Sequence, residues 1–130
     1  MGAVLLDTHV VHWWSAEPNR VSTAARQALE AADELAVAAI SWYELGWLAR
    51  HGRIALNVPI RSWLETLGAQ LRTLGVSPAI ADTAVALPAS FPGDPADRLI
   101  YATAIEHGFK LVTKDREIAD HDRPRSLVVW

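Results

Sequence analysis

The feature that most constrains the fold is the alternation of short apolar runs with longer amphipathic stretches along the 130 residues. Three runs have the length and apolar character of buried strands: Ala3–Leu6, Leu35–Ala39 and Lys110–Thr113. The segments between them carry apolar residues at helical spacing. Strands that alternate with helices are typical of a parallel sheet covered by helices on both faces. We therefore predict an α/β fold, an α/β/α sandwich with a central, mostly parallel sheet.

Capping and turn residues predict the remaining elements. Ser22 is a candidate N-cap, Pro59 begins a later helix, and Gly108 ends the helix that Asp94 begins. Helices are expected over residues 9–14, 23–32, 41–50, 59–74, 82–87 and 94–107. Two further strands are expected over residues 76–80 and 127–129. Pro78 restricts the first of these to a sheet edge or a strand end.

Length and composition limit the class of protein. The 130 residues predict a single domain, residues 1–130, that can build its own core. The absence of cysteine excludes disulfide scaffolds, thiolate zinc sites and cysteine nucleophiles. No apolar run is long enough to cross a membrane and no secretion signal is evident, so we expect a cytoplasmic protein without a membrane partner. A net charge of -3 argues against a general nucleic-acid coat protein.

Four carboxylates from distant parts of the chain are expected at one edge of the sheet. Asp7 directly follows the first strand, and Asp115 follows the Lys110–Thr113 strand. Glu44 lies on the first turn after the second strand, and Asp97 lies on the first turn of its helix. Because ligands of such sheets bind beyond the carboxyl ends of the strands, we predict that these four side chains form one site.

Clustered carboxylates repel one another unless a proton or a cation compensates them. An all-oxygen site of this kind suits Mg²⁺ or Mn²⁺, which can activate a water for attack on a phosphodiester. The Thr113 hydroxyl is expected to orient a ligand-bound water in the same site. The pattern therefore favours metal-dependent hydrolysis of a phosphodiester, with Asp7, Glu44, Asp97 and Asp115 as the metal ligands.

Each acid except Glu44 also has an ordinary structural explanation. Asp7 and Asp94 precede helices and are typical N-caps. Asp97 lies in the first turn of its helix, where the helix dipole stabilises a negative charge. Asp115 suits the cap of the turn that follows it. Glu44 is different, because tryptophan, tyrosine and leucine surround it in the sequence, and a carboxylate in apolar company is costly.

Four motifs occur in order along the chain: Leu5-Leu6-Asp7-Thr8-His9, Ser41-Trp42-Tyr43-Glu44-Leu45, Gly93-Asp94-Pro95-Ala96-Asp97-Arg98 and Val112-Thr113-Lys114-Asp115. This ordered set resembles the motifs of PIN-domain nucleases, and most closely those of the VapC toxins of bacterial toxin–antitoxin modules. The resemblance implies a PIN-like sandwich and a Mg²⁺- or Mn²⁺-dependent endoribonuclease that leaves 5′-phosphate and 3′-hydroxyl ends. It maps the acidic site to Asp7, Glu44, Asp97 and Asp115, with Thr113 as an ancillary polar group.

The resemblance also implies partners. These are an RNA substrate, a cognate VapB-like antitoxin whose C-terminal segment lies in a groove beside the site, and a second copy of the chain in a homodimer. Candidate groove residues are Trp13, Trp14, Trp42, Trp47 and Leu48. Candidate phosphate-binding residues are Arg50, Arg53, Lys114 and Arg116. Arg98 is a candidate partner of a phosphate or, with more weight, of a carboxylate in the acidic cluster.

Rival interpretations come from other classes of protein. A phosphorylation receiver needs adjacent acids after the first strand, where Thr8 and His9 follow Asp7, and an acid at the end of the third, where none occurs before Asp82. A haloacid-dehalogenase-like phosphatase needs a second acid where His9 stands. A catalytically silent PIN-like module that binds RNA or a partner keeps all four acids and stays open.

Overall fold

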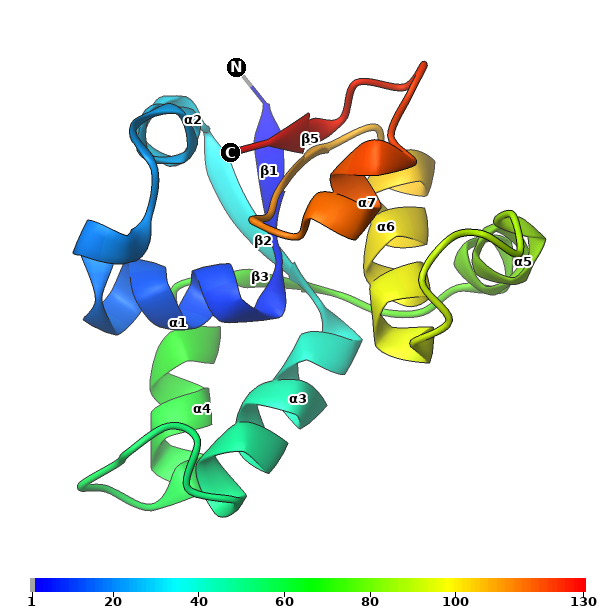
Figure 1. Ribbon diagram of the computed structural model, residues 1–130. Helices are drawn as coiled ribbons and strands as arrows, with labels where there is room; N and C mark the ends of the chain where they lie inside the picture. Colours follow the sequence, from blue (N-terminus) through cyan, green and yellow to red (C-terminus); the bar gives the residue numbers. More distant parts are fainter. Residues whose placement is uncertain (1) are drawn as a thin grey trace.

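The computed structural model describes residues 2–130, which form a five-stranded parallel sheet in the order β3-β2-β1-β4-β5 (Figure 1). All four strand pairs are parallel. The strands are β1 (Ala3–Leu6), β2 (Glu34–Ala38), β3 (Arg72–Leu74), β4 (Lys110–Val112) and β5 (Val128–Val129). The predicted α/β fold with a parallel sheet is confirmed. The strand order differs from the 2-1-3-4-5 order of receiver-type folds.

Helices cover both faces of the sheet. They are α1 (Thr8–Ala16), α2 (Thr23–Ala31), α3 (Ala39–Arg50), α4 (Ile60–Gly68), α5 (Pro78–Ala86), α6 (Pro95–His107) and α7 (Arg116–Asp120), with a 3₁₀ turn η1 at Pro18–Arg20. Helices α1 to α4 share one hydrophobic cluster with the sheet, and α6 and α7 share the other. Helix α5 packs on α6 and lies outside it in Figure 1.

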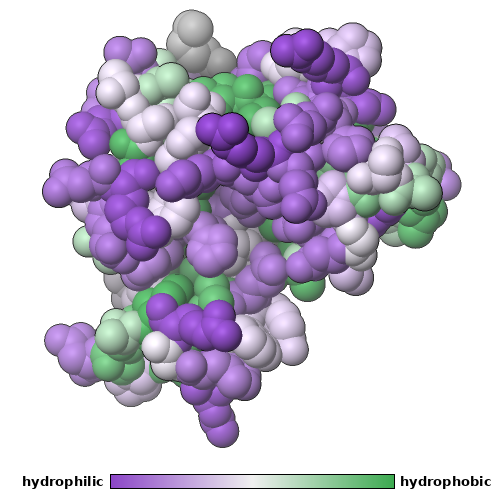
Figure 2. Space-filling model, in the orientation of Figure 1, coloured by the Kyte–Doolittle hydropathy of each residue, from purple (hydrophilic) through white to green (hydrophobic). Residues whose placement is uncertain are grey.

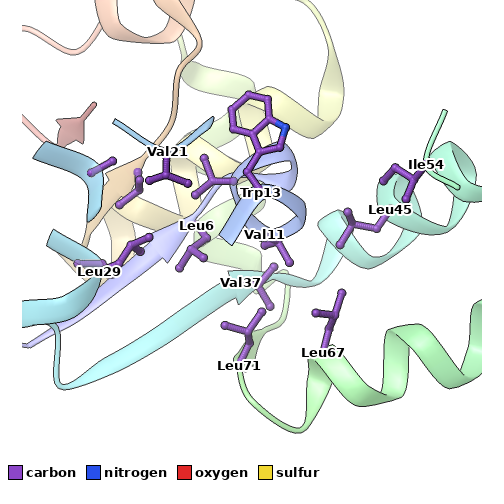
Figure 3. Packing of buried hydrophobic residues seen from close by; sticks show 14 residues of the cluster. Leu6, Val11, Trp13, Val21, Leu29, Val37, Leu45, Ile54, Leu67 and Leu71 are labelled. Atoms are coloured by element: carbon purple, nitrogen blue, oxygen red, sulfur yellow. The ribbon is translucent and has the colours of Figure 1, made fainter. Parts of the chain in front are cut away.

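The alternation of side chains along the strands creates the two cores. In β1, Val4 and Leu6 enter the cluster beneath α1 to α4, whereas Leu5 enters the cluster beneath α6 and α7. In β4, Leu111 and Val112 divide in the same way. Figure 3 shows the first cluster, in which labelled side chains from α1, β2, α3 and α4 point toward a common interior. Strands buried on both faces explain the continuous apolar runs in the sequence.

The sequence prediction was wrong between residues 69 and 80. The predicted helix over 59–74 ends at Gly68, and the chain then forms strand β3, which pairs with β2. The predicted strand over 76–80 does not form, because residues 78–80 are instead the first turn of α5. The reason is a local cap: Ser77 Oγ accepts a hydrogen bond from Ile80 N at 3.1 Å, and Pro78 occupies the first helical turn.

Asp122 fixes the last strand against the sheet. Its side chain is 6% exposed, accepts a hydrogen bond from Tyr101 Oη at 2.7 Å through Oδ1, and accepts another from Val128 N at 2.8 Å through Oδ2. Burial, followed by the hydrogen bond to Asp122, raises the pKa of Tyr101 to about 12. Strand β5, held in this way, accepts a hydrogen bond from Thr113 N through the carbonyl of Val129. Helix α7, which precedes Asp122, was not predicted.

The surface in the view of Figure 2 is largely hydrophilic, with apolar surface visible at α5, where Val85 is 78% exposed. No helix in the described part of the chain is long and apolar enough to cross a bilayer.

The two environments of apolar residues predict a clear difference in stability. Leu45 on α3 is 0% exposed, so Leu45→Ala leaves a cavity and should lower the free energy of unfolding by about 2–5 kcal/mol. Val85→Ala should change it by less than about 0.5 kcal/mol. Urea denaturation of both variants measures the difference. Equal effects would contradict the assignment of Leu45 to the core.

Candidate active site

A cleft of about 880 Å³ lies at the carboxyl edge of the sheet. The amino ends of α1, α3 and α6 converge beside it (Figure 1). It is lined by every residue that the sequence proposes for the site: Asp7, Glu44, Asp97, Thr113 and Asp115. The structure therefore brings all five together, although 108 positions separate Asp7 from Asp115.

Asp7 links the end of β1 to the beginning of α1. Its Oδ1 accepts a hydrogen bond from Thr8 N at 2.8 Å and thereby caps α1. Its Oδ2 accepts a hydrogen bond from Thr113 Oγ1 at 2.6 Å. Burial raises the pKa of Asp7 above its ordinary value even though both hydrogen bonds favour the ionised form. Asp7 thus serves both as a cap and as a wall of the cleft.

Thr113 connects two of the acids. Its side chain is buried, it donates to Asp7, and its Oγ1 accepts a hydrogen bond from Asp115 N at 3.0 Å. The Asp115 side chain caps α7 through Oδ1, which accepts hydrogen bonds from Glu117 N at 2.9 Å and Ile118 N at 3.3 Å. Thr113 therefore fixes the ends of β1 and β4 relative to each other.

Glu44 is held from α1, through a residue that the sequence did not single out. Thr8 Oγ1 donates to Glu44 Oε1 at 2.5 Å and lies 2.9 Å from Ser41 Oγ. Thr8 and Ser41 are both buried. Burial first, and then the charges of Asp7 and Asp94, raise the pKa of Glu44. The signal for Thr8 was its place beside Asp7 in the first motif.

Asp97 differs from the other acids of the cleft in its hydrogen bonding. Among residues 2–130 its carboxylate has no hydrogen bond in the structure, whereas Asp7, Asp94 and Asp115 each accept at least one. Burial, followed by the charges of the other acids, raises its pKa to about 7. A proton or a cation beside Asp97 therefore stabilises the cleft at neutral pH.

Asp94 caps α6, as expected from the Asp94-Pro95 pair. Its Oδ1 accepts a hydrogen bond from Ala96 N at 2.8 Å, and its side chain also lines the cleft. The charge of Asp94 contributes to the raised pKa of both Glu44 and Asp97. Asp94 therefore belongs to the electrostatic environment of the site.

The expected role of Arg98 was wrong. Its guanidinium does not pair with the acids and is directed at the loop between α5 and α6. It donates to five backbone carbonyls, those of Ala84, Leu87, Pro88, Phe91 and Pro92. These carbonyls lie at the end of α5 and in the loop that follows, where regular backbone partners are few. The five donors of Arg98 satisfy them and fix the loop that precedes Asp94.

The donor set of the cleft fits a hard, hydrated cation. Within residues 2–130, no three acidic or histidine side chains are already arranged to enclose a metal ion. Mg²⁺ does not require such a cage, because it retains several waters and binds through one or two carboxylates. The side-chain donors are carboxylate and hydroxyl oxygens, and burial raises the pKa values of Asp7, Glu44 and Asp97, which makes their negative charge costly unless a cation is present.

Aromatic side chains form the walls of the cleft. Trp13, Trp47 and Leu48 line it, as expected for the groove, together with Tyr43 and Trp130. Tyr43 is 69% exposed and Trp47 is 42% exposed, whereas Trp13 is 8% exposed. The two other expected groove residues, Trp14 and Trp42, do not line the cleft and pack against the first core cluster.

Comparison with known proteins shows the class of protein that this fold and this acidic cleft define. The family model of the PIN domain matches residues 4–124, and the chain belongs to the PIN-domain family. Ribonuclease VapC22 of Mycobacterium tuberculosis (strain ATCC 25618 / H37Rv) is 65% identical over 130 residues, which cover the whole of both chains. The relationship sets aside the receiver and haloacid-dehalogenase-like alternatives.

Solved structures resemble the fold. A toxin–antitoxin complex from Klebsiella pneumoniae superposes with a TM-score of 0.70 at 24% identity and covers 98% of this chain and 96% of that chain. VapBC2 from Rickettsia felis, bound to a DNA fragment from its promoter, has a TM-score of 0.68 at 16% identity and covers 98% and 97%. At such identities, the likeness concerns the fold.

The raised pKa of Asp97 predicts how stability depends on pH. A carboxyl whose pKa rises on folding, here from 3.8 to about 7, contributes stability below the lower value and loses it as pH rises through the higher one. In EDTA at pH 8, Asp97→Asn should therefore raise the melting temperature by a few degrees. The gain should shrink between pH 8 and pH 5. Differential scanning fluorimetry measures both.

Asp82→Asn is the matched control, because Asp82 is exposed on α5 and lies outside the cleft. Its melting temperature should follow that of the parent protein at each pH. A lower melting temperature for Asp97→Asn than for the parent at pH 8 would contradict the electrostatic account.

Proposed function

We propose that this chain is a metal-dependent endoribonuclease that acts as the toxin of a toxin–antitoxin pair in the cytoplasm. The observation that carries the proposal is the convergence of Asp7, Glu44, Asp97 and Asp115 in one cleft of a PIN-domain protein. The similarity to a relative named as a ribonuclease over the whole chain supports the same activity.

The side chains divide the work in the cleft. Asp97 and Asp7 are the proposed principal ligands of Mg²⁺ or Mn²⁺, and Glu44 and Asp115 complete the set directly or through waters. When bound, the cation supplies a water of lowered pKa and a positive charge that stabilises a phosphorane-like transition state. Thr113 holds the Asp7 carboxylate in place, so that Asp7 cannot rotate away when charge in the cleft changes.

Thr8 has the corresponding role for Glu44. A hydroxyl at 2.5 Å favours the ionised carboxylate and thus opposes the effect of burial on the pKa of Glu44. The Thr113 hydroxyl thereby fixes the carboxylate of Asp7, at the start of α1, and the Thr8 hydroxyl fixes that of Glu44 on α3. Preorganised acids of this kind need not move when the phosphodiester reacts.

Cleavage of RNA tests the proposed activity. With Mn²⁺ or Mg²⁺, the purified parent protein should cut structured RNA and leave 5′-phosphate ends, whereas EDTA should abolish cutting. Asp97→Asn should reduce the rate by at least about 100-fold, because it removes a charged ligand from the cleft. Asp82→Asn should cut at the parent rate. Gel analysis of end-labelled RNA measures the products.

Binding of the metal provides an independent readout. Mn²⁺ should raise the melting temperature of the parent protein and of Asp82→Asn, but less that of Asp97→Asn. A folded Asp97→Asn protein that cuts as fast as the parent would remove Asp97 from the mechanism. Mn²⁺ binding without cutting of any RNA would favour the silent binding module.

The proposed partners follow from the family and from the walls of the cleft. The structural neighbours include toxin–antitoxin complexes, and we propose that a VapB-like antitoxin covers this chain as well. The exposed rings of Tyr43 and Trp47 beside Glu44 suit an apolar segment of such a partner. A homodimer with two such clefts belongs to the same proposal.

Growth of a bacterial host tests the toxin role. Induced expression of the parent chain without an antitoxin should arrest growth, because cleavage of cellular RNA halts protein synthesis. Expression of Asp97→Asn to the same level should permit growth, as measured by optical density and immunoblot. Arrest by both proteins would show that toxicity does not depend on the acidic cleft.

A further inference from the structure

Lys114 is a lysine that lies among the acids of the cleft. The chain has two lysines, and Lys114 is the one that lies between Thr113 and Asp115 and lines the cleft. Its side chain is exposed, and in the described part of the chain it takes part in none of the ion pairs. A cation next to several carboxylates would be expected to pair with one of them, and Lys114 makes a different contact.

That contact is the ring of Trp13. Lys114 Nζ lies 5.8 Å from the ring centroid, within the range of a cation–π interaction. The ring itself is fixed, because Trp13 is 8% exposed and is flanked by the rings of His9 at 5.8 Å and Trp130 at 5.9 Å. Trp13 therefore holds the ammonium group at the flank of the acidic cluster.

The other candidate cations do not share this position. Arg50 and Arg53 do not line the cleft, and Arg98 is committed to backbone carbonyls. Arg20 also lies over the Trp13 ring, at 4.7 Å, but pairs with Glu17 and lies outside the cleft. Of the candidates, only Lys114 and Arg116 remain to meet a polyanion that approaches the acids.

We propose that Lys114 binds a backbone phosphate of the RNA segment that enters the acidic cleft, and that Trp13 positions it for this contact. The inference rests on the proposed function, because it takes RNA as the ligand of the cleft. Lys114 supplies positive charge where the carboxylates alone would repel the backbone. The exposed ammonium group carries three N–H donors that can reach phosphate oxygens, at the end of a flexible aliphatic chain.

The salt dependence of RNA binding tests the contact. The probe is a fluorescein-labelled single-stranded RNA of 20 nucleotides and mixed sequence, measured by anisotropy between 50 and 200 mM KCl. Asp97→Asn serves as the background, so that the RNA is not cut. Loss of one phosphate contact in Lys114→Gln should lower the slope of log Kd against log salt by about 0.7 and weaken binding several-fold at 50 mM.

The other lysine is the matched control. Lys110 lies at the opposite end of β4, outside the cleft, and donates to the carbonyl of Ser126. Lys110→Gln removes the same charge from the protein but should leave the slope unchanged. An unchanged slope in Lys114→Gln would overturn the proposal, as would equal losses in both variants, which would indicate an effect of net charge alone.

Variants of Trp13 test the positioning. Trp13→Phe keeps an aromatic face and should retain the parent slope, whereas Trp13→Leu should bind about 2- to 3-fold more weakly and shift the slope toward that of Lys114→Gln. Circular dichroism confirms that each variant is folded. A Trp13→Leu protein with the parent slope would assign Lys114 a position independent of the ring.

The outcomes separate this inference from the proposed function. Metal-dependent cutting that is lost in Asp97→Asn, combined with an unchanged slope in Lys114→Gln, would retain the nuclease and reject the contact. Absence of RNA binding by every variant would reject RNA as the ligand of the cleft and both proposals with it. If the protein bound an acidic peptide through Lys114 but did not bind the RNA, Lys114 would belong to an interface with a protein partner.

Discussion

The hydrogen bond from Thr113 to Asp7 is the contact on which the geometry of the cleft depends. It joins residues 106 positions apart, and it follows from strand register, because Leu6 and Val112 are paired in the sheet. Asp7 N also donates to the carbonyl of Val112 at 3.0 Å, so backbone and side chain fix the same junction. The parallel sheet gathers the carboxyl ends of its strands at one edge, and this junction determines how closely the acids approach.

Capping and membership of the acidic cluster are compatible uses of one carboxylate. Asp7 caps α1 through Oδ1 and receives Thr113 through Oδ2, and Asp115 uses Oδ1 for both of its capping bonds. The positive ends of helix dipoles offset part of the negative charge that these acids bring to the cleft. Burial, followed by the charges of the other acids, raises the pKa of Asp97 to about 7; Asp97 lies past the cap of α6, and no hydrogen bond from residues 2–130 opposes this rise. Hydrogen bonds at helix caps thus reduce the electrostatic cost of bringing the other acids together. Within the described part of the chain, the Asp97 carboxylate has no such hydrogen bond to reduce this cost.

The sequence predicted the parts of the structure that local patterns determine. The apolar runs predict the buried strands β1, β2 and β4. The acids that follow strands in the sequence then predict that acidic side chains converge at one edge of the sheet. The boundary between α4 and β3 was not, because Leu71 and Leu74 suit either a helix face or a strand, and pairing with β2 decides between them. The role of Arg98 was also inaccessible, since its five carbonyl partners come together only when the loop after α5 folds back over α6. Thr8 was visible in its motif, but its contact with Glu44 needs α1 and α3 to be neighbours.

The balance of charge in the cleft links the binding of cations to the binding of a polyanion. Five carboxylates line the cleft, and the charges of the other acids contribute to the raised pKa values of Glu44 and Asp97. The lysine and arginine side chains that line it are those of Lys114 and Arg116. A phosphate that approaches such a surface meets net repulsion until protons or cations reduce the negative charge. Any cation that lowers this repulsion favours the polyanion, and by linkage the polyanion favours the cation to the same extent. Lys114 lies over the ring of Trp13 and does not form an ion pair with Asp7 or Asp115. The acids and the ammonium group are therefore not used up by each other. In the proposed complex, the acids therefore stay available to a metal and the ammonium group stays available to the RNA backbone.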